Sequence, residues 1–154
     1  MKSTRCFLAV LAGSLGLAAL AAPVALGQPD SRGGPSHSRK VFDNGNTAAC
    51  EMTDTAAFRL ENPVRVDRIE LWYRWHHHEE SVSYTISRHG KTLRSGVLTR
   101  GDCDPYQENW CNAVDRFDLR LDEGKYVVRT ERPRVCQNAG SDGNGVVRVY
   151  GSRH

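Results

Sequence analysis

Apolar and polar residues alternate at every second position in several stretches of this chain. One stretch covers residues 69–75, and the others cover residues 82–86 and 117–121. A period of two places successive side chains on opposite faces of a strand, whereas a helix repeats its apolar positions every three or four residues. The pattern therefore predicts strands with one buried face and one polar face, which is typical of antiparallel sheets.

Turn-forming segments separate these stretches from further strand-like runs. The turns contain glycine with Asp, Asn or His, and they lie at residues 89–91, 122–124 and 140–145. The additional runs lie at residues 58–60, 93–99, 125–130 and 145–150. Short strands with regular turns, and no amphipathic helix of useful length, predict an all-β domain. We expect an antiparallel two-sheet β-sandwich of jelly-roll type.

The beginning of the chain has the order of a secretory signal peptide. Two cations precede an apolar run over residues 6–20, and small residues follow up to Gly27. This order predicts export with cleavage near Gly27, so that residues 1–27 are a signal peptide and the mature chain does not span a membrane. The predicted location is therefore periplasmic or secreted.

The rest of the chain divides into a linker and one domain. Residues 28–40 are rich in Gly, Pro and Ser, which predicts a flexible linker, and residues 41–154 have the usual length of a single domain. Removing residues 1–27 takes away two cations and no anions, so the formal charge falls from +3 to +1. Charges of both signs alternate along the remainder, and this pattern argues against a nucleic-acid partner.

Four cysteines follow the signal peptide, an even number in a chain that is predicted to enter an oxidising compartment. Three pairings are possible. A bridge between Cys103 and Cys111 would staple a local polar loop, which leaves Cys50 and Cys136 for a long-range bridge. Such a closure is worth about 3–5 kcal/mol. A zinc site is the poorer interpretation, because no two of the cysteines have the short CxxC spacing.

Three consecutive histidines, His76 to His78, precede Glu79 and Glu80 between two strand-like stretches. Imidazole and carboxylate groups bind zinc and copper, and a strand would place His76 and His78 on one face. With Glu80 as a third ligand, these residues are the predicted metal site. The competing interpretation is a solvated hairpin turn without metal. The HExxH motif of metalloproteases is absent.

Two turns are rich in side-chain oxygens, residues 43–46 (DNGN) and residues 141–145 (SDGNG). Calcium binds carboxylate, amide and carbonyl oxygens of such turns, so a structural calcium ion is one interpretation. The other is that Asn, Asp and Gly are present because they favour tight turns.

Three aromatic residues outside the predicted core are candidates for ligand binding. Trp72 lies on the strand face opposite Tyr73 and Trp75, while Tyr106 and Trp110 lie in the loop between two cysteines. Exposed flat rings suit stacking against sugars. We therefore predict a glycan or another cell-envelope component as the partner of Trp72, Tyr106 and Trp110.

The sequence contains no recognisable catalytic motif that would support an enzymatic function. The sequence contains no nucleophile-elbow glycines, no recognisable metalloprotease motif and no phosphate-cradling loop. The predicted function is an exported, non-enzymatic binding or surface-interaction module. The alternative is a zinc- or copper-binding protein that uses the histidine turn.

A series of short motifs is spread over residues 41–151. In chain order they are DNGN at 43–46, FxL at 58–60, IxxWYxW at 69–75, WxN at 110–112, GxYxV at 124–128, QNxxSxGxG at 137–145 and VxG at 149–151. Together they resemble an uncharacterised family of small secreted bacterial β-sandwich domains. The resemblance implies a β-sandwich and export, and it implies no activity or ligand.

The chain departs from this family pattern at two places. Cys50 follows the DNGN element and Cys136 directly precedes the QNxxSxGxG element. Because both elements gain a cysteine, the resemblance implies that they are neighbours in space, which supports a bridge between Cys50 and Cys136. The second departure is the histidine turn, which occupies a position where the family pattern has a connection rich in Gly and Asn.

Overall fold

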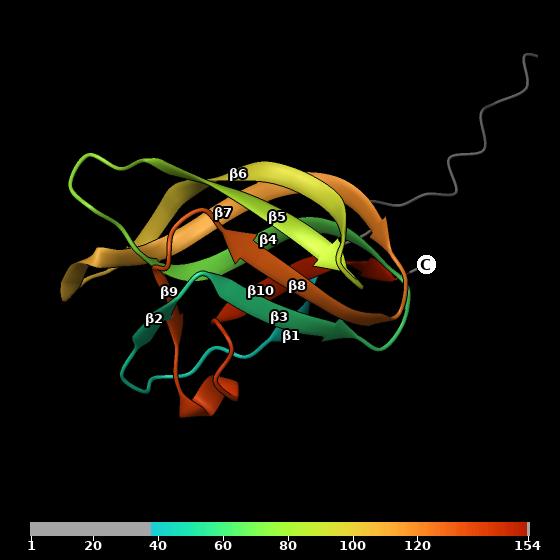
Figure 1. The fold of residues 1–154 in the computed structure, drawn as a ribbon, viewed down its shortest axis with the longest axis horizontal. Coiled ribbons are helices and arrows are strands. Elements are labelled where there is room, and N and C mark those ends of the chain that lie inside the picture. The colour runs from blue at the N-terminus through green and yellow to red at the C-terminus, as the bar shows by residue number, and fades with distance from the viewer. Residues whose placement is uncertain (1–37, 154) are drawn as a thin grey trace, which may run out of the picture. The chain divides into compact units, whose positions relative to one another are not determined.

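The computed structural model of the chain describes residues 38–153, which fold into antiparallel strands (Figure 1). The strands are β1 (Arg39–Asp43), β2 (Glu51–Thr53), β3 (Thr55–Leu60), β4 (Val64–Arg74), β5 (Ser81–Arg88), β6 (Lys91–Asp104), β7 (Gln107–Leu121), β8 (Gly124–Thr130), β9 (Val135–Gln137) and β10 (Val147–Arg153). A 3-10 turn, η1 (Ala139–Ser141), precedes β10. The predicted all-β, antiparallel class is confirmed.

The described strands form one sheet rather than two. Neighbouring strands follow the order β1-β10-β4-β7-β6-β5-β8-β3, and β2 pairs with β9 beside this path. The sheet is continuous because residues 99–104 of β6 pair with residues 107–114 of β7. It closes nearly into a barrel (Figure 1) and does not form a clear two-sheet sandwich such as the predicted jelly roll. Alternation identifies the buried face of each strand, but it does not say which strands are neighbours.

The hydrophobic core fills the inside of this sheet. Ile69, Leu71, Tyr73 and Trp75 of the clearest alternating stretch are at most 2% exposed, as predicted. Each fully buried side chain of this size stabilises the fold by about 1.5–3 kcal/mol. Other strands contribute further buried residues, among them Phe58, Val82, Tyr84, Ile86, Leu98, Tyr126, Val128, Val147 and Val149.

Strands β6 and β7 are paired between Thr99 and Asp104 of β6 but not between Lys91 and Thr99, where they separate. A polar cluster fills the gap between these unpaired parts. Tyr84 Oη donates a hydrogen bond to Asp115 Oδ2 at 2.7 Å, and Arg94 Nη2 donates to the same oxygen at 2.6 Å. Arg94 Nε also donates to Tyr84 Oη at 3.0 Å. Burial raises the pKa of Tyr84 above its ordinary value. The cluster therefore closes the gap with groups that satisfy one another's hydrogen bonds.

The opposite seam of the barrel lies between β3 and the strands β1 and β10. Gly145 forms a parallel bridge with Ala56, and its N–H donates to Thr55 O at 3.1 Å. A Cβ at position 145 would lie 2.6 Å from Thr55 O, so only glycine fits. The rings of Phe42 and Phe58 pack across the same seam with centroids 6.2 Å apart. Side-chain packing and one bridge thus bring together edges that no continuous ladder joins.

Both predicted disulfides are present. Cys50–Cys136 ties the segment before β2 to β9, and Cys103–Cys111 joins β6 to β7. The first bridge lies between the DNGN and QNxxSxGxG elements. These two elements also share hydrogen bonds, since Asn44 Oδ1 accepts from Val147 N at 2.7 Å and Asn44 Nδ2 donates to Gly145 O at 3.1 Å. The two elements are therefore neighbours, as predicted.

The domain begins slightly earlier than predicted. Strand β1 starts at Arg39, so Arg39 and Lys40 belong to the sheet and not to the linker. The predicted signal peptide, residues 1–27, and the predicted linker up to residue 37 lie outside the described residues. Within residues 38–153, no helix is long and apolar enough to cross a membrane.

Candidate functional site

The histidine-rich segment connects two strands that are not neighbours. Strands β4 and β5 are separated in the sheet by β7 and β6, so the segment is a crossing connection at one end of the barrel (Figure 1). Its ends bond to the strands that it crosses, because Trp75 N donates to Asn109 O at 2.7 Å and Arg100 N donates to Glu80 O at 3.0 Å. The expected hairpin turn is therefore wrong, although its location between the two strands is correct.

The three histidines do not continue the strand pattern. Strand β4 ends at Arg74, and a turn closes where Glu79 N donates to His76 O at 3.2 Å. His78 has a φ of 63°, in the left-handed region. All three histidine side chains are exposed. The prediction that His76 and His78 share one strand face is wrong, because a turn and not a strand carries them.

Glu79, and not Glu80, is the glutamate that organises this turn. The Glu79 side chain is 9% exposed and accepts hydrogen bonds from Arg132 Nη1 at 2.9 Å and from Arg134 Nη1 at 2.8 Å. Glu79 Oε2 also accepts from the backbone N–H of His76 at 3.1 Å. Glu80 is exposed. The sequence offered two adjacent glutamates and no signal that one of them would be buried.

The predicted metal ligands His76, His78 and Glu80 are not gathered into a cluster. Within the part of the chain that the structure describes, no group of three or more His, Cys, Asp or Glu residues could hold a metal ion. His77 and His78 are the histidine pair in ring contact, with centroids 5.3 Å apart. Zinc or copper binding at this turn stays a prediction.

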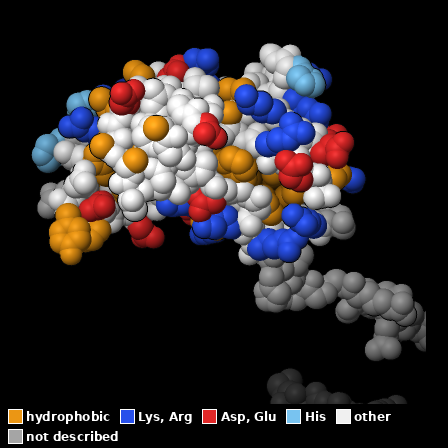
Figure 2. Space-filling model, turned by 90° about the horizontal axis from the view of Figure 1, so that it is seen from below, with side chains coloured by type: hydrophobic (Ala, Val, Ile, Leu, Met, Phe, Trp, Pro, Cys, Tyr) orange, Lys and Arg blue, Asp and Glu red, His pale blue; other side chains and the backbone are white. Residues whose placement is uncertain are grey.

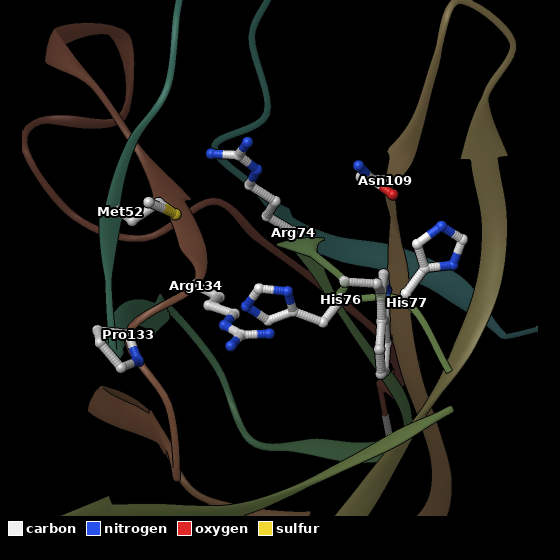
Figure 3. A pocket seen from close by; sticks show the side chains of 8 residues that line it. Met52, Arg74, His76, His77, Asn109, Pro133 and Arg134 are labelled. Atoms are coloured by element: carbon white, nitrogen blue, oxygen red, sulfur yellow. The ribbon is translucent and has the colours of Figure 1, made fainter. Parts of the chain in front are cut away.

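Below the turn lies a pocket of about 380 Å³, which we call the turn pocket. It is lined by Met52, Arg74, Trp75, His76, His77, Asn109, Pro133 and Arg134. In Figure 3, His76 and Arg134 lie between Met52 and Pro133 on one side and His77 and Asn109 on the other. The pocket is therefore lined by basic and amide groups over a partly apolar wall.

Two buried polar atoms near this end of the barrel have no hydrogen-bond partner among the described residues, Tyr73 Oη and Trp75 Nε1. Their rings contact each other with centroids 4.8 Å apart. Burial, together with the negative charge of Glu79, raises the pKa of Tyr73 to about 12. The phenol is thus held neutral by its surroundings and not by a hydrogen bond.

Replacing Tyr73 by phenylalanine is therefore expected to leave the free energy of unfolding at pH 7 within about 1 kcal/mol of the original value, because no hydrogen bond is lost. The folded-state pKa of Tyr73 lies above its ordinary value of 10.0. The stability that the neutral Tyr73 phenol contributes is therefore fully present below about pH 10 and is lost as the pH rises towards 12. Chemical denaturation at several alkaline pH values should show a shallower loss in Tyr73→Phe. An unchanged alkaline loss would contradict this assignment.

Two of the three predicted ligand-binding aromatics lie side by side. The rings of Trp72 on β4 and Trp110 on β7 are stacked, with centroids 6.3 Å apart and an interplanar angle of 15°. The strand register explains this, because Trp110 is opposite Arg74 and Asn112 is opposite Trp72, so the two tryptophans are diagonal neighbours on one face.

Both tryptophans line a second pocket of about 600 Å³, which we call the aromatic pocket. Its other lining residues are Asn46, Thr47, Ala48, Ala49, Cys50, Arg74, Asp104, Gln107, Val146 and Arg148. Tyr106, the third predicted aromatic, is 93% exposed at the tip between β6 and β7 and does not line this pocket. The structure therefore assembles Trp72 and Trp110 and leaves Tyr106 apart.

Residues of and next to the DNGN and QNxxSxGxG elements support one wall of the aromatic pocket. Asn138 Nδ2 donates to Ala48 O at 3.2 Å, and Cys50 of the same wall is bonded to Cys136. Asn138 also caps η1, where its side chain and that of Ser141 bond each other's backbone N–H groups. The motifs that carry the family resemblance thus position pocket residues, which the sequence alone did not indicate.

The side-chain oxygens that suggested calcium make hydrogen bonds within the chain. Asp43 Oδ1 accepts from Gly45 N at 2.8 Å, and Asn46 Oδ1 accepts from Ala48 N at 3.0 Å. Ser141 Oγ donates to Asn144 O at 2.5 Å. These bonds are those of tight turns. A structural calcium ion stays a prediction.

No protein-family model matches this chain, and a comparison with curated protein sequences finds no significant match. The resemblance to small secreted bacterial β-sandwich domains therefore stays a prediction.

Proposed function

We propose that this chain is an exported, non-enzymatic binding module whose aromatic pocket holds a glycan, such as a component of the cell envelope. The observation that carries the proposal is the parallel pair Trp72 and Trp110 in a pocket that also contains amide, hydroxyl and guanidinium groups. Flat aromatic faces bury the apolar face of a sugar ring, and polar groups at the rim bond its hydroxyls.

The surroundings of the pair favour a preformed site. Trp72 and Trp110 are half-buried and lie on paired strands, while Cys50–Cys136 anchors the opposite wall. A site built on strands and a disulfide needs little ordering when the ligand binds, which favours affinity. Two disulfides are compatible with an extracytoplasmic location.

Metal binding at the histidine turn is the second candidate. Its support is the contact between the exposed rings of His77 and His78, which are close enough to approach one ion. A third ligand is not at hand in the described residues, so we place this function after glycan binding.

Replacing Trp110 by alanine is expected to weaken glycan binding at least about tenfold, because one stacking face is lost. A panel of envelope and extracellular polysaccharides, tested by affinity electrophoresis, would identify the ligand and measure the change. Tyr106→Ala is the matched control, since this ring lies in the same hairpin but outside the pocket. Equal losses in both variants would contradict the site, and silence across the panel would contradict the function.

A further inference from the structure

Arg74 lies at the junction of the two pockets and lines both of them. It is the last residue of β4, two positions after Trp72 and directly opposite Trp110 on β7. Its backbone N–H donates to Arg134 O at 2.9 Å, which fixes β4 next to the wall of the turn pocket. A ligand that stacks on the two tryptophans therefore lies beside this guanidinium.

The other arginines around the pockets already have partners. Arg132 and Arg134 donate to the buried carboxylate of Glu79. Arg148 forms an ion pair with Asp43 at 3.4 Å and donates to Asn112 Oδ1 at 3.3 Å.

The same holds for many arginines elsewhere on the domain. Ion pairs such as Arg65–Asp118 and Arg129–Asp54 join charges of opposite sign. Figure 2 shows basic and acidic side chains intermixed on one face of the molecule. In contrast to these paired arginines, the exposed guanidinium of Arg74 makes no hydrogen bond or ion pair with any residue in the range 38–153.

Among the side chains that the structure describes, the lining of the turn pocket includes Arg74, Arg134, His76, His77 and Asn109 and no carboxylate. Trp75 also lines it, and the buried indole N–H of Trp75 has no partner among the described residues. Among its described lining residues, the aromatic pocket includes the carboxylate of Asp104, which accepts a hydrogen bond from Tyr106 N at 2.7 Å. The described polar groups around Arg74 are thus mainly hydrogen-bond donors, which suits a ligand with an anionic group that accepts hydrogen bonds.

We infer that the ligand is an acidic glycan, with one sugar ring stacked on Trp72 and Trp110 and a carboxylate or sulfate bound by Arg74. This inference rests on the proposed function and adds the chemical class of the ligand. Arginine suits the task because its planar fork can donate two parallel hydrogen bonds to a carboxylate or sulfate. Loss of one such charge-assisted contact is expected to change affinity about tenfold or more.

The test compares acidic polysaccharides with neutral partners of the same backbone. The probes are polygalacturonate with its carboxyl-reduced galactan, and dextran sulfate with dextran. Affinity electrophoresis of the mature protein at low salt is expected to show at least about tenfold tighter binding to one acidic member than to its neutral partner. The pair that shows the difference distinguishes carboxylate from sulfate. The preference should shrink at high salt.

Arg74→Gln is expected to reduce the ratio of acidic to neutral affinity to about one, because the change removes the charge from the site. Arg120→Gln is the matched control, an exposed arginine on the outer face of β7 far along the strand from Trp110, and it should leave the ratio unchanged. Equal affinity of the unaltered protein for acidic and neutral probes would overturn the inference and leave the proposed function standing. Binding of none of the four polymers would contradict both. If the protein bound a single-stranded DNA oligonucleotide as tightly as the acidic polysaccharide, binding would depend on charge alone, and the inference would be overturned.

Discussion

Replacing both Cys50 and Cys136 by alanine is expected to lower the free energy of unfolding by about 4 kcal/mol. The bridge joins residues 86 positions apart, so the unfolded chain gains much conformational freedom when it is removed. Losses of this size are a large part of the total stability of a domain of this length. Urea denaturation of the protein, followed by tryptophan fluorescence, measures the change.

The second disulfide provides the matched control. Cys103 and Cys111 are only 8 positions apart, so the same double alanine replacement there is expected to cost about 2.5 kcal/mol. Because Cys50 lines the aromatic pocket, loss of the long-range bridge should also weaken the proposed glycan binding under conditions where the variant is still folded. A smaller loss of stability for the Cys50 and Cys136 variant than for the Cys103 and Cys111 variant would contradict the loop-length argument.

The alternating pattern predicted strands well because it reports directly on burial. Ile69, Leu71, Tyr73 and Trp75 all lie inside the barrel, and the intervening Trp72 lies outside. The same pattern could not reveal the single sheet. Neighbouring strands are determined by pairings between distant residues, such as Thr99 with Val114, and a period of two is the same for any neighbour.

The candidate site could be predicted only in part, for a similar reason. Trp72 and Trp110 stood out by residue type and by their places outside the core, but their contact depends on the register between β4 and β7. Tyr106 looked equivalent in sequence and lies apart, because it occupies the tip and not a paired position. The inferred role of Arg74 could not be predicted from the sequence either, since it depends on which other arginines form an ion pair with a carboxylate.

The choice between Glu79 and Glu80 shows how a local backbone conformation can decide a site. The left-handed conformation of His78 turns the chain after His76, and Glu79 then accepts the backbone N–H of His76. Non-glycine residues seldom adopt this conformation, so alternation extended from β4 wrongly placed His76 and His78 on one strand face.

Replacing Glu79 by glutamine is expected to lower the free energy of unfolding by about 2 kcal/mol. The change keeps the shape of the side chain but removes the negative charge that two guanidinium groups share. Most of the loss should come from Arg134, whose side chain is only 19% exposed, because Arg132 is half-exposed and its ion pair is screened by water. Chemical denaturation at neutral pH measures the effect.

Glu80→Gln is the control for this substitution. Because Glu80 is exposed, its replacement should change the free energy of unfolding by less than about 0.5 kcal/mol. A second readout separates the charge of Glu79 from its packing. The negative charge of Glu79 helps to raise the pKa of Tyr73, so the pKa of Tyr73 should fall in Glu79→Gln and stay unchanged in Glu80→Gln. Ultraviolet titration of tyrosinate, with Tyr73→Phe as the reference, follows that one phenol. Equal stability of the two glutamine variants, together with an unmoved Tyr73, would show that the turn does not depend on the buried carboxylate.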